Sequence, residues 1–178
     1  VVPHPGNSRF GYAMSQQGNV GRYDLTTGHS QLIKPVHPEG ERLRFNWNAA
    51  IAQDPFNDDA IYYGSQYVHY SIDRGNNWTI ISPDLTTNDK EKQKQHESGG
   101  LTFDATGAEN FTTILAIEPS PLDRNVIWVG TDDGNLQLTR DGGKKWLNVG
   151  KKIFGAPKGS WIPPVSYTHL TLPTKRSV

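Results

Sequence analysis

Short runs of apolar, aromatic and β-branched residues alternate with turn-forming residues along most of the chain. The clearest series is 113–118, 126–131, 135–140 and 145–149. The breaks between these runs contain Pro119 and Pro121, then Asp133-Gly134, then Gly142-Gly143. Proline and the Asp-Gly and Gly-Gly pairs favour tight turns between strands. The pattern therefore predicts four short strands that follow one another as an antiparallel meander.

The same series occurs earlier in the chain. Residues 52–64 align with residues 118–130, so that Pro55 matches Pro121 and Gly64 matches Gly130. The octapeptide Ser71–Trp78 then aligns with Thr139–Trp146. The second copy has a longer turn near 131–135, where extra loop residues cost little. We therefore expect strands at 48–53, 60–64, 68–72 and 78–82.

A third, incomplete unit precedes these two. Residues 9–14, 19–24 and 30–33 have the pattern of the last three strands of another unit, and Thr26-Thr27-Gly28 supplies its outer turn. A repeated four-stranded meander is a blade of a β-propeller. The sequence thus predicts an all-β fold, a partial β-propeller of about three four-stranded blades near 9–34, 46–82 and 112–150. Because closed propellers typically have four to eight blades, we expect the remaining blades of a parent chain to be its partners.

Composition agrees with this fold and excludes several functions. The chain has 178 residues, with 18 Gly and 12 Pro for turns, and 5 Trp and 7 Tyr for cross-strand contacts. Lys and Arg number 18 against 18 Asp and Glu, so no basic excess indicates nucleic-acid binding. Cysteine is absent, which excludes disulfides and thiolate metal sites. No apolar run approaches the ~18 residues that a membrane helix requires.

The C-terminal segment is set apart from the repeats. Residues 165–174, VSYTHLTLPT, look like a translated sequencing adapter. The alternative is an ordinary polar tail. Taken as an artefact, residues 165–178 contribute nothing to fold or function, and the propeller fragment extends over residues 1–164.

The two octapeptides share the pattern Ser/Thr-x-Asp-x-Gly-x-x-Trp, which resembles the BNR repeat or Asp-box. In this pattern the Asp accepts hydrogen bonds from its own turn, the Gly allows a positive φ, and the Trp packs against the blade. The alternative, that Asp73 and Asp141 are catalytic acids, is disfavoured. We assign a structural role to Ser71, Asp73, Gly75, Trp78, Thr139, Asp141, Gly143 and Trp146.

A wider resemblance covers residues 46–163. It includes Phe45-Asn46-Trp47-Asn48, Ser82-Pro83-Asp84-Leu85-Thr86, Gly107-Ala108-Glu109 and Gly130-Thr131-Asp132-Asp133-Gly134. These segments look like large exported bacterial proteins of the sortilin-type or glycosyl-hydrolase-like BNR propellers. The resemblance implies a propeller fold, a secreted or periplasmic location, and more weakly a glycan or peptide ligand.

Strand order predicts which residues share a face. If the octapeptides join the third and fourth strands of each blade, the turns between second and third strands lie at the opposite end, with the connections between blades. Propellers usually bind ligands at that end, which is an analogy at the level of the fold. The expected face carries Gln66 and Tyr67, Asp132 and Asp133, and Arg44, Trp47 and Asn48. The long connection 83–111 joins them, including the charged segment 89–97, which predicts a short solvated helix or a loop.

Three acidic residues could supply chemistry there. Asp132, Asp133 and Glu109 could act as acid and base in glycoside hydrolysis or coordinate Ca²⁺. For Asp132-Asp133-Gly134 the alternative is an ordinary hairpin turn, where these residue types are expected. Arg44 could hold an anionic group, or it could simply pack beside Trp47. The histidines show no metal-ligand spacing, so we expect no metal and no cofactor. Coordination of Ca²⁺ by the acidic residues stays open as an alternative, but no sequence motif supports it. Before the set-aside segment 165–178, which holds His169, the histidines are His4, His29, His37, His69 and His96.

Two functions remain open at this point. The favoured one is a non-catalytic propeller that binds a ligand or protein, or serves as a scaffold, within a larger exported protein. The alternative is part of an Asp-box glycoside hydrolase, sialidase-like or glucanase-like, with acids drawn from several blades. The Arg-Ile-Pro element of sialidases does not occur in the chain, which disfavours the sialidase form of that alternative.

Overall fold

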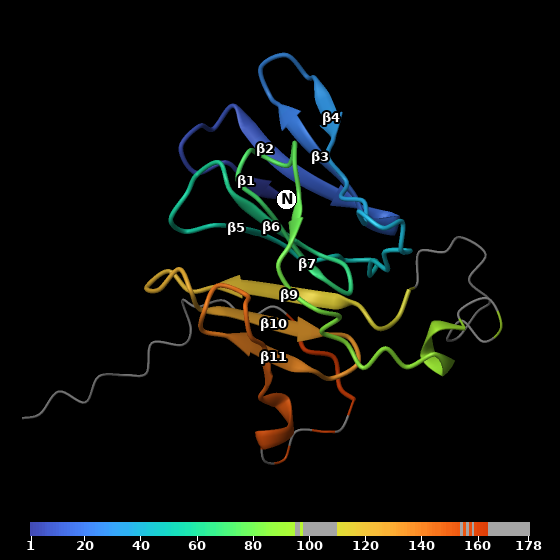
Figure 1. Ribbon diagram of the computed structural model, residues 1–178. Coiled ribbons are helices and arrows are strands. Elements are labelled where there is room, and N and C mark those ends of the chain that lie inside the picture. The colour runs from blue at the N-terminus through green and yellow to red at the C-terminus, as the bar shows by residue number, and fades with distance from the viewer. Residues whose placement is uncertain (95–96, 98–109, 154, 156, 158, 164–178) are drawn as a thin grey trace, which may run out of the picture.

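The computed structural model describes residues 1–94, 97, 110–153, 155, 157 and 159–163. Its strands form three separate four-stranded antiparallel sheets, which lie one beyond the next in chain order (Figure 1). The first sheet contains β1 (Val2–Pro3), β2 (Phe10–Ser15), β3 (Asn19–Asp24) and β4 (Ser30–Leu32). The second contains β5 (Ile51–Gln53), β6 (Ile61–Gly64), β7 (Val68–Ser71) and β8 (Thr79–Ile80). The third contains β9 (Ile114–Pro119), β10 (Ile127–Thr131), β11 (Leu136–Thr139) and β12 (Leu147–Asn148).

Among the described residues three 3₁₀ turns are helical, together with Glu97, which is assigned to an α-helix. The 3₁₀ turns are η1 (Gln16–Gly18), η2 (Glu91–Gln93) and η3 (Gly150–Lys152). The segment 89–97, expected as a short solvated helix or a loop, thus contains η2 and the helical Glu97 in its described part. None of the described helical segments is long and apolar enough to cross a bilayer.

The first sheet has one strand more than the sequence indicates. We expected three strands there, whereas β1 pairs with β2 through Val2 opposite Tyr12 and Pro3 opposite Gly11. Two features concealed β1: it is only two residues long, and it contains a proline, which reads against a strand. A proline is tolerated here because β1 is an edge strand with a single neighbour. All three sheets are thus complete four-stranded meanders.

The other strands lie where the pattern predicts them, although most are shorter. The expected run 78–82 is only Thr79–Ile80, and 145–149 is only Leu147–Asn148. The residues at the ends of these runs belong to turns and connections, and most of them are half-buried, as Trp78, Ile81 and Trp146 are. Apolar pattern marks burial, and burial extends beyond the residues that form ladder hydrogen bonds.

The two repeated turns, 71–78 and 139–146, have the same internal hydrogen bonds. In the first, Asp73 Oδ1 accepts the Asn77 N–H at 2.9 Å, and Ser71 Oγ accepts the Gly75 N–H at 2.8 Å. In the second, Asp141 Oδ1 accepts the Lys145 N–H at 2.8 Å, and Thr139 Oγ1 accepts the Gly143 N–H at 3.0 Å. Each aspartate thus accepts a hydrogen bond from a backbone donor of its own turn. The side-chain amide and then the N–H of Asn77 lower the pKa of the Asp73 carboxyl, and the Lys145 N–H lowers the pKa of the Asp141 carboxyl.

The tryptophan of each repeated turn contacts the sheet before its own. The Trp78 indole N–H donates to the Ile33 carbonyl at 2.7 Å. The Trp146 indole N–H is shared between the Ile81 carbonyl at 3.2 Å and the Gly143 carbonyl of its own turn at 3.0 Å. Ile33 and Ile81 follow the outer strands β4 and β8 directly. The indole therefore joins neighbouring sheets as well as packing on its own.

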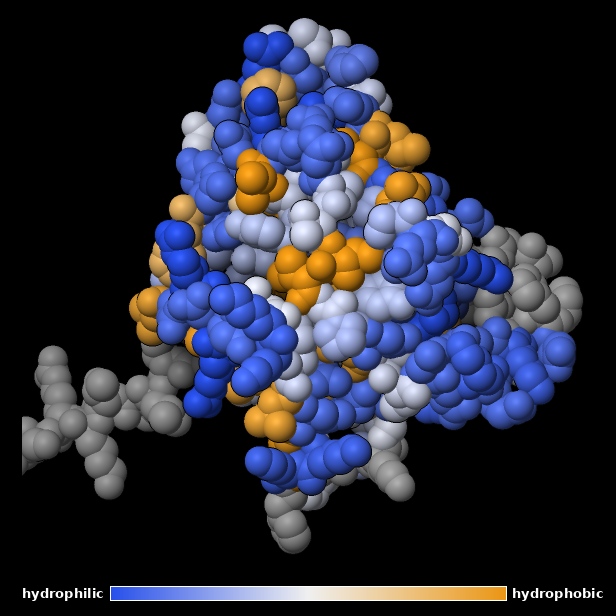
Figure 2. All heavy atoms as spheres, in the orientation of Figure 1, coloured by the Kyte–Doolittle hydropathy of each residue, from blue (hydrophilic) through white to orange (hydrophobic). Residues whose placement is uncertain are grey.

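Two apolar cores fill the spaces between the sheets. The core between the first and second sheets includes Tyr12, Val20, Ile33, Phe45, Ala49, Ile61 and Tyr63. The core between the second and third includes Ala50, Tyr62, Val68, Leu85, Ile114, Ile117, Ile127 and Val129. Strand β5 contacts β1 on one side and β9 on the other, so the first strands of the three sheets adjoin. Elsewhere the surface in view is mainly hydrophilic, with small apolar patches (Figure 2).

Two adjacent glycines of the second repeated turn provide a test of this packing. Both have positive φ, +69° at Gly142 and +98° at Gly143. A Cβ at Gly143 would lie 2.6 Å from the Ile81 carbonyl oxygen, whereas the nearest atom to a Cβ at Gly142 is 3.6 Å away. We expect Gly142→Ala to lower the free energy of unfolding by ~1–2 kcal/mol through φ strain alone. Gly143→Ala should lower it by a further ~1–3 kcal/mol, because Ile81 must move. Urea unfolding measures the free energy of unfolding of both variants. Equal decreases in the two would show that the turn does not pack tightly against the second sheet at Ile81.

Candidate functional site

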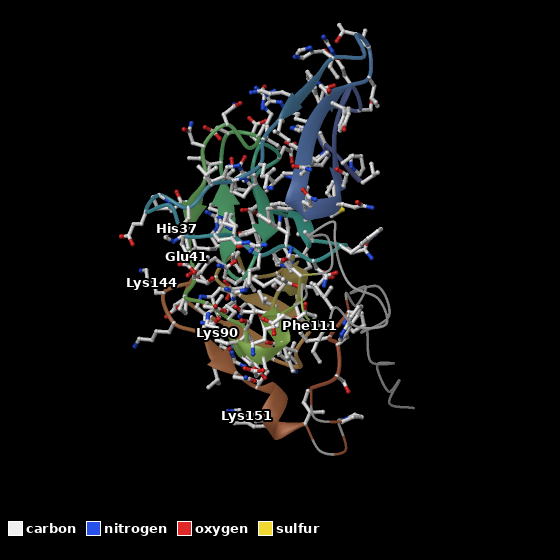
Figure 3. All side chains as sticks on the ribbon, turned by 90° about the vertical axis from the view of Figure 1, so that its right-hand side faces the viewer. His37, Glu41, Lys90, Phe111, Lys144 and Lys151 are labelled. Carbon is white, nitrogen blue, oxygen red and sulfur yellow. The ribbon has the colours of Figure 1, made fainter. Side chains whose placement is uncertain are left out.

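The turns and connections separate to two ends of the sheets, as strand order predicts. The Arg74 N–H donates to the Asp59 carbonyl at 2.8 Å, and the Gly142 N–H donates to the Asn125 carbonyl at 3.0 Å. Both repeated turns therefore lie beside the turns that join the first and second strands of their sheets. The opposite end carries the β2–β3, β6–β7 and β10–β11 turns, the connection 33–50 and the described residues of the connection 81–113. We call it the connection face. Figure 3 looks onto it, with His37 and Glu41 from the first connection and Lys90 and Phe111 from the second.

Asp132 lies in the β10–β11 turn on the connection face, and its side chain points inward. Its Oδ1 accepts the Thr113 N–H at 2.9 Å, and its Oδ2 accepts the Thr113 hydroxyl at 2.5 Å and the Asn46 amide at 3.2 Å. The residue is fully buried. Burial raises the pKa of the Asp132 carboxyl above its ordinary value, and the hydrogen bonds from Thr113 oppose this. Asp132 thus binds the first and second connections to the third sheet.

Asp133 has a parallel role with a different part of the second connection. Its Oδ2 accepts both the N–H and the hydroxyl of Thr87, each at 2.7 Å, and its Oδ1 accepts the Thr131 hydroxyl at 2.5 Å. Only 3% of the residue is exposed. Both carboxylates of the Asp132-Asp133 pair are therefore engaged by backbone N–H and hydroxyl groups of the protein itself.

Arg44 is also buried and engaged. Its Nη2 donates to Asp84 Oδ2 at 2.7 Å, its Nε donates to the Thr112 carbonyl at 3.2 Å, and its backbone N–H donates to Gln66 Oε1 at 2.8 Å. The guanidinium therefore joins the first connection to both ends of the second. Removing it would leave the Asp84 carboxylate without its cation, so its main effect is on how the connections are held.

Trp47 and Asn48 differ from these residues because both are exposed. The Trp47 side chain is 46% exposed, and together with Asn48 it forms one wall of a pocket of about 450 Å³. The other wall is the end of β2 and the η1 turn of the first sheet, contributed by Met14, Ser15, Gln16, Gln17 and Asn19. Every one of these lining residues is uncharged. We call this the Trp47 pocket.

The η1 wall of the Trp47 pocket is the part that sequence reasoning missed. The rule of strand order that places Gln66 and Asp132 on this face also places the β2–β3 turn of the first sheet there, and this is the signal in the sequence that could have found it. Gln66 itself is buried, and its amide donates to Glu41 Oε1 at 3.2 Å. The Tyr67 hydroxyl donates to Glu41 Oε2 at 2.6 Å. Glu109 lies outside the described residues.

A second pocket lies at the other end, between the second and third sheets. It has a volume of about 370 Å³, and Asp54, Phe56, Tyr62, Tyr70 and Arg124 contribute to its lining. The Asp54 carboxylate accepts the Tyr70 hydroxyl at 2.7 Å, the Tyr62 hydroxyl at 3.3 Å and the Phe56 N–H at 2.8 Å. Protein donors therefore already occupy this carboxylate, as they occupy Asp132 and Asp133.

The described part of the chain holds no group of three or more His, Asp or Glu that could bind an ion. Of the histidines, His69 is fully buried, with its Nε2 2.8 Å from Ser65 Oγ and its ring at right angles to Trp78. Its place on β7 makes it part of the second sheet's core.

Comparison with known proteins identifies the fold. No protein-family model and no curated protein matches the sequence. The structure is similar to the GH74 xyloglucanase from Xanthomonas campestris, with a TM-score of 0.51 and 20% identity over 83% of this chain and 20% of that one. It is also similar to a GH74 enzyme from Niastella koreensis, with a TM-score of 0.50 and 16% identity over 93% of this chain and 22% of that one.

The three sheets are blades of a β-propeller. At these identities the likeness concerns the fold alone. The chain spans about a fifth of the length of the two enzymes. From here on the sheets are called the first, second and third blades.

The buried histidine of the second blade gives a prediction on pH. Burial lowers the pKa of His69 from 6.5 to about 4, and the nearby His37 adds to this. Between these values the unfolded chain binds a proton at His69 that the folded chain does not, so stability falls as pH decreases from ~6.5 to ~4. We expect His69→Gln to reduce the loss of unfolding free energy over this range.

Chemical unfolding at several pH values measures the effect, and His29→Gln is the control because His29 is exposed. If the wild type and His69→Gln lose stability equally across the range, His69 does not govern it.

Proposed function

We propose that this chain is a segment of an Asp-box, or BNR, β-propeller of the sortilin-type or glycosyl-hydrolase-like exported proteins. In this proposal it binds a neutral glycan without cleaving it, and the binding site is the Trp47 pocket on the connection face. The observation that carries the proposal is the half-exposed indole of Trp47 at the edge of a pocket with no charged lining residue.

The lining of the pocket suits a hydroxyl-rich ligand. One face of a pyranose ring carries C–H groups, which pack on an indole, while its hydroxyls both donate and accept hydrogen bonds at the rim. Side-chain amides also do both, and the pocket offers those of Gln16, Asn19 and Asn48. Binding sites of this kind combine an aromatic surface with a few polar groups that fix orientation. An uncharged lining favours a neutral glycan over an anionic one.

The state of the acidic residues supports binding without hydrolysis. A glycoside hydrolase needs two carboxyl groups facing a common space, about 5–10 Å apart. Asp132 and Asp133 are buried, and their oxygens accept hydrogen bonds from Thr113, Asn46, Thr87 and Thr131. Using either as an acid or base would require these contacts to break.

The alternative is that the chain is part of an Asp-box glycoside hydrolase. The observation in its favour is the similarity to two GH74 enzymes, one of which is named as a xyloglucanase. In that case the catalytic acids would be drawn from several blades, most of them outside the three described here. Export of the protein is part of both proposals, and it is supported by the sequence resemblance to the exported BNR propellers.

The Trp47 pocket can be tested with a defined probe. Isothermal titration calorimetry with a xyloglucan oligosaccharide should give a measurable Kd for the wild-type chain. Trp47→Ala should weaken binding by ~10-fold or more, as the loss of a central tryptophan commonly does. Phe56→Ala is the matched control, since Phe56 is 40% exposed and belongs to a turn at the opposite end. It should bind like the wild type.

Three results would count against the proposal. They are no binding by the wild-type chain, equal binding by Trp47→Ala, or a loss confined to Phe56→Ala. Release of reducing ends from the polysaccharide, abolished by Asp133→Asn, would instead establish the hydrolase alternative for this face.

A further inference from the structure

The contact between neighbouring blades, here called the joint, has the same backbone form twice. In both joints, the isoleucine that follows the outer strand of one blade accepts the indole N–H of the next blade's tryptophan. Ile33 accepts it from Trp78 in the first joint, and Ile81 accepts it from Trp146 in the second. The two joints can therefore be compared position by position.

The strand registers and the hydrogen bonds of the turns give four pairs of counterparts at the end of the blades that carries the repeated turns. With the residue of the first joint before its counterpart, they are His4 and Asp54, Arg22 and Tyr70, Asp59 and Asn125, and Arg74 and Gly142.

In the first joint, side chains of the first blade reach across to acceptors of the second. His4 Nε2 lies 3.3 Å from Asp59 Oδ1. Arg22 Nη1 donates to the Arg74 carbonyl at 2.9 Å and to Asn76 Oδ1 at 3.3 Å. An imidazole and a guanidinium thus fill this end of the first joint.

The second joint has acceptors at these positions instead. The second blade contributes Asp54 and Tyr70, and the Tyr70 hydroxyl donates to Asp54 Oδ2 at 2.7 Å. On the third blade, the Gly142 carbonyl accepts no hydrogen bond from the described residues. These three residues and Asn125 belong to the lining of the pocket of about 370 Å³. We call it the joint pocket, and it lies where the first joint has its bridging guanidinium.

The carboxylate of Asp54 has no cation beside it. The residue is only 7% exposed, and its carboxylate accepts hydrogen bonds from the neutral Tyr62 and Tyr70 hydroxyls and the Phe56 N–H. No cationic side chain of the described residues forms an ion pair with it. Buried charges in proteins are normally paired, and a carboxylate has about four acceptor sites. Asp54 can therefore still accept a charged donor that enters the pocket.

The walls of the joint pocket suit an arginine side chain. The Tyr62 and Tyr70 rings stack at a centroid distance of 4.6 Å, and Ile81 and Ile127 add apolar surface. Arginine packs its methylene stem along apolar surface, and its planar guanidinium stacks on aromatic rings. Its several N–H donors can also reach acceptors on two sides at once.

Arg124 of the third blade lines the same pocket but does not supply the missing donor. Its guanidinium lies over the Phe56 ring, 5.3 Å from the ring centroid. The residue is exposed, so solvent and salt screen its charge from a ligand in the pocket.

We propose that the joint pocket binds an arginine side chain of a partner polypeptide. The guanidinium enters between the second and third blades and donates to the Asp54 carboxylate and the Gly142 carbonyl. It thereby takes the place that Arg22 has in the first joint. The Trp47 pocket lies at the opposite end of the blades, so this inference stands independently of the proposed glycan binding.

A blocked amino acid tests the proposal. In N-acetyl-arginine amide both ends are neutral, so the guanidinium carries the only charge. Isothermal titration calorimetry should give saturable binding to the 178-residue chain. N-acetyl-citrulline amide, the uncharged isostere, should bind ~10-fold or more weakly, because it leaves the buried carboxylate without a cation. Asp54→Asn should weaken binding of the arginine probe by a similar factor, and urea unfolding checks that this variant remains folded.

Three further variants serve as controls. Asp58→Asn removes an exposed carboxylate from the same turn and should bind the probe like the wild type. Trp47→Ala should also bind like the wild type, which separates this site from the glycan site. Tyr70→Arg supplies a guanidinium from within the chain, as Arg22 does in the first joint, and should abolish binding of the probe while the chain stays folded.

The proposal would be overturned by no binding to the wild type, by equal binding of the arginine and citrulline probes, or by unchanged binding to Asp54→Asn. Unchanged binding to folded Tyr70→Arg would place the probe elsewhere and overturn it as well. Binding that appears only after Arg124→Gln would show that the protein's own arginine is the occupant. Free arginine that binds ~10-fold or more tightly than the blocked probe would exclude a polypeptide as the source of the side chain.

Discussion

The rest of this structure depends on the contact between a repeated turn and the blade before it. The indole N–H groups of Trp78 and Trp146 reach carbonyl groups beyond their own blades, and glycines at the same turns allow the approach. A four-stranded meander with outer strands as short as β8 or β12 buries little on its own. Stacking against a neighbour supplies the apolar contact that a single blade lacks. The turn therefore sets both the spacing and the order of the blades.

This dependence also explains what the sequence could predict. The fold followed from the repeat: a proline, a glycine and an octapeptide recurring in the same order are enough to identify a four-stranded unit. Strand ends were less predictable, because Ile33 and Ile81 have the apolar character of strand residues but belong to the joint between blades. β1 was missed since Pro3 reads as a breaker, and only the presence of β2 beside it makes a strand there.

The sequence could predict the end of the blades at which the candidate residues lie, but not whether their side chains are buried and hydrogen-bonded. Strand order placed Asp132, Asp133, Arg44 and Trp47 at one end, and the structure has them there. What the sequence could not supply is which side chains face inward, because that is decided by partners distant along the chain, such as Thr113 and Thr87 for the two aspartates. Whether acidic residues in such a turn have a catalytic or a structural role can be decided only once their hydrogen-bond partners are known. Trp47 and Asn48 are exposed, whereas Asn46 before them and Ala49 after them are buried, a difference that the residue types alone do not predict.

The paired aspartates of the β10–β11 turn have a further consequence for how such a propeller can diversify. Asp133 holds the departing stem of the long connection at Thr87, and Asp132 holds its returning stem at Thr113. With both stems fixed to adjacent residues of one rigid turn, the polypeptide between them can gain or lose length without moving the blades. Loops whose ends are anchored to a stable scaffold tolerate insertion at small entropic expense. The two carboxylates therefore anchor the long connection at a site where its sequence and length can change on the connection face without a change in the packing of the blades.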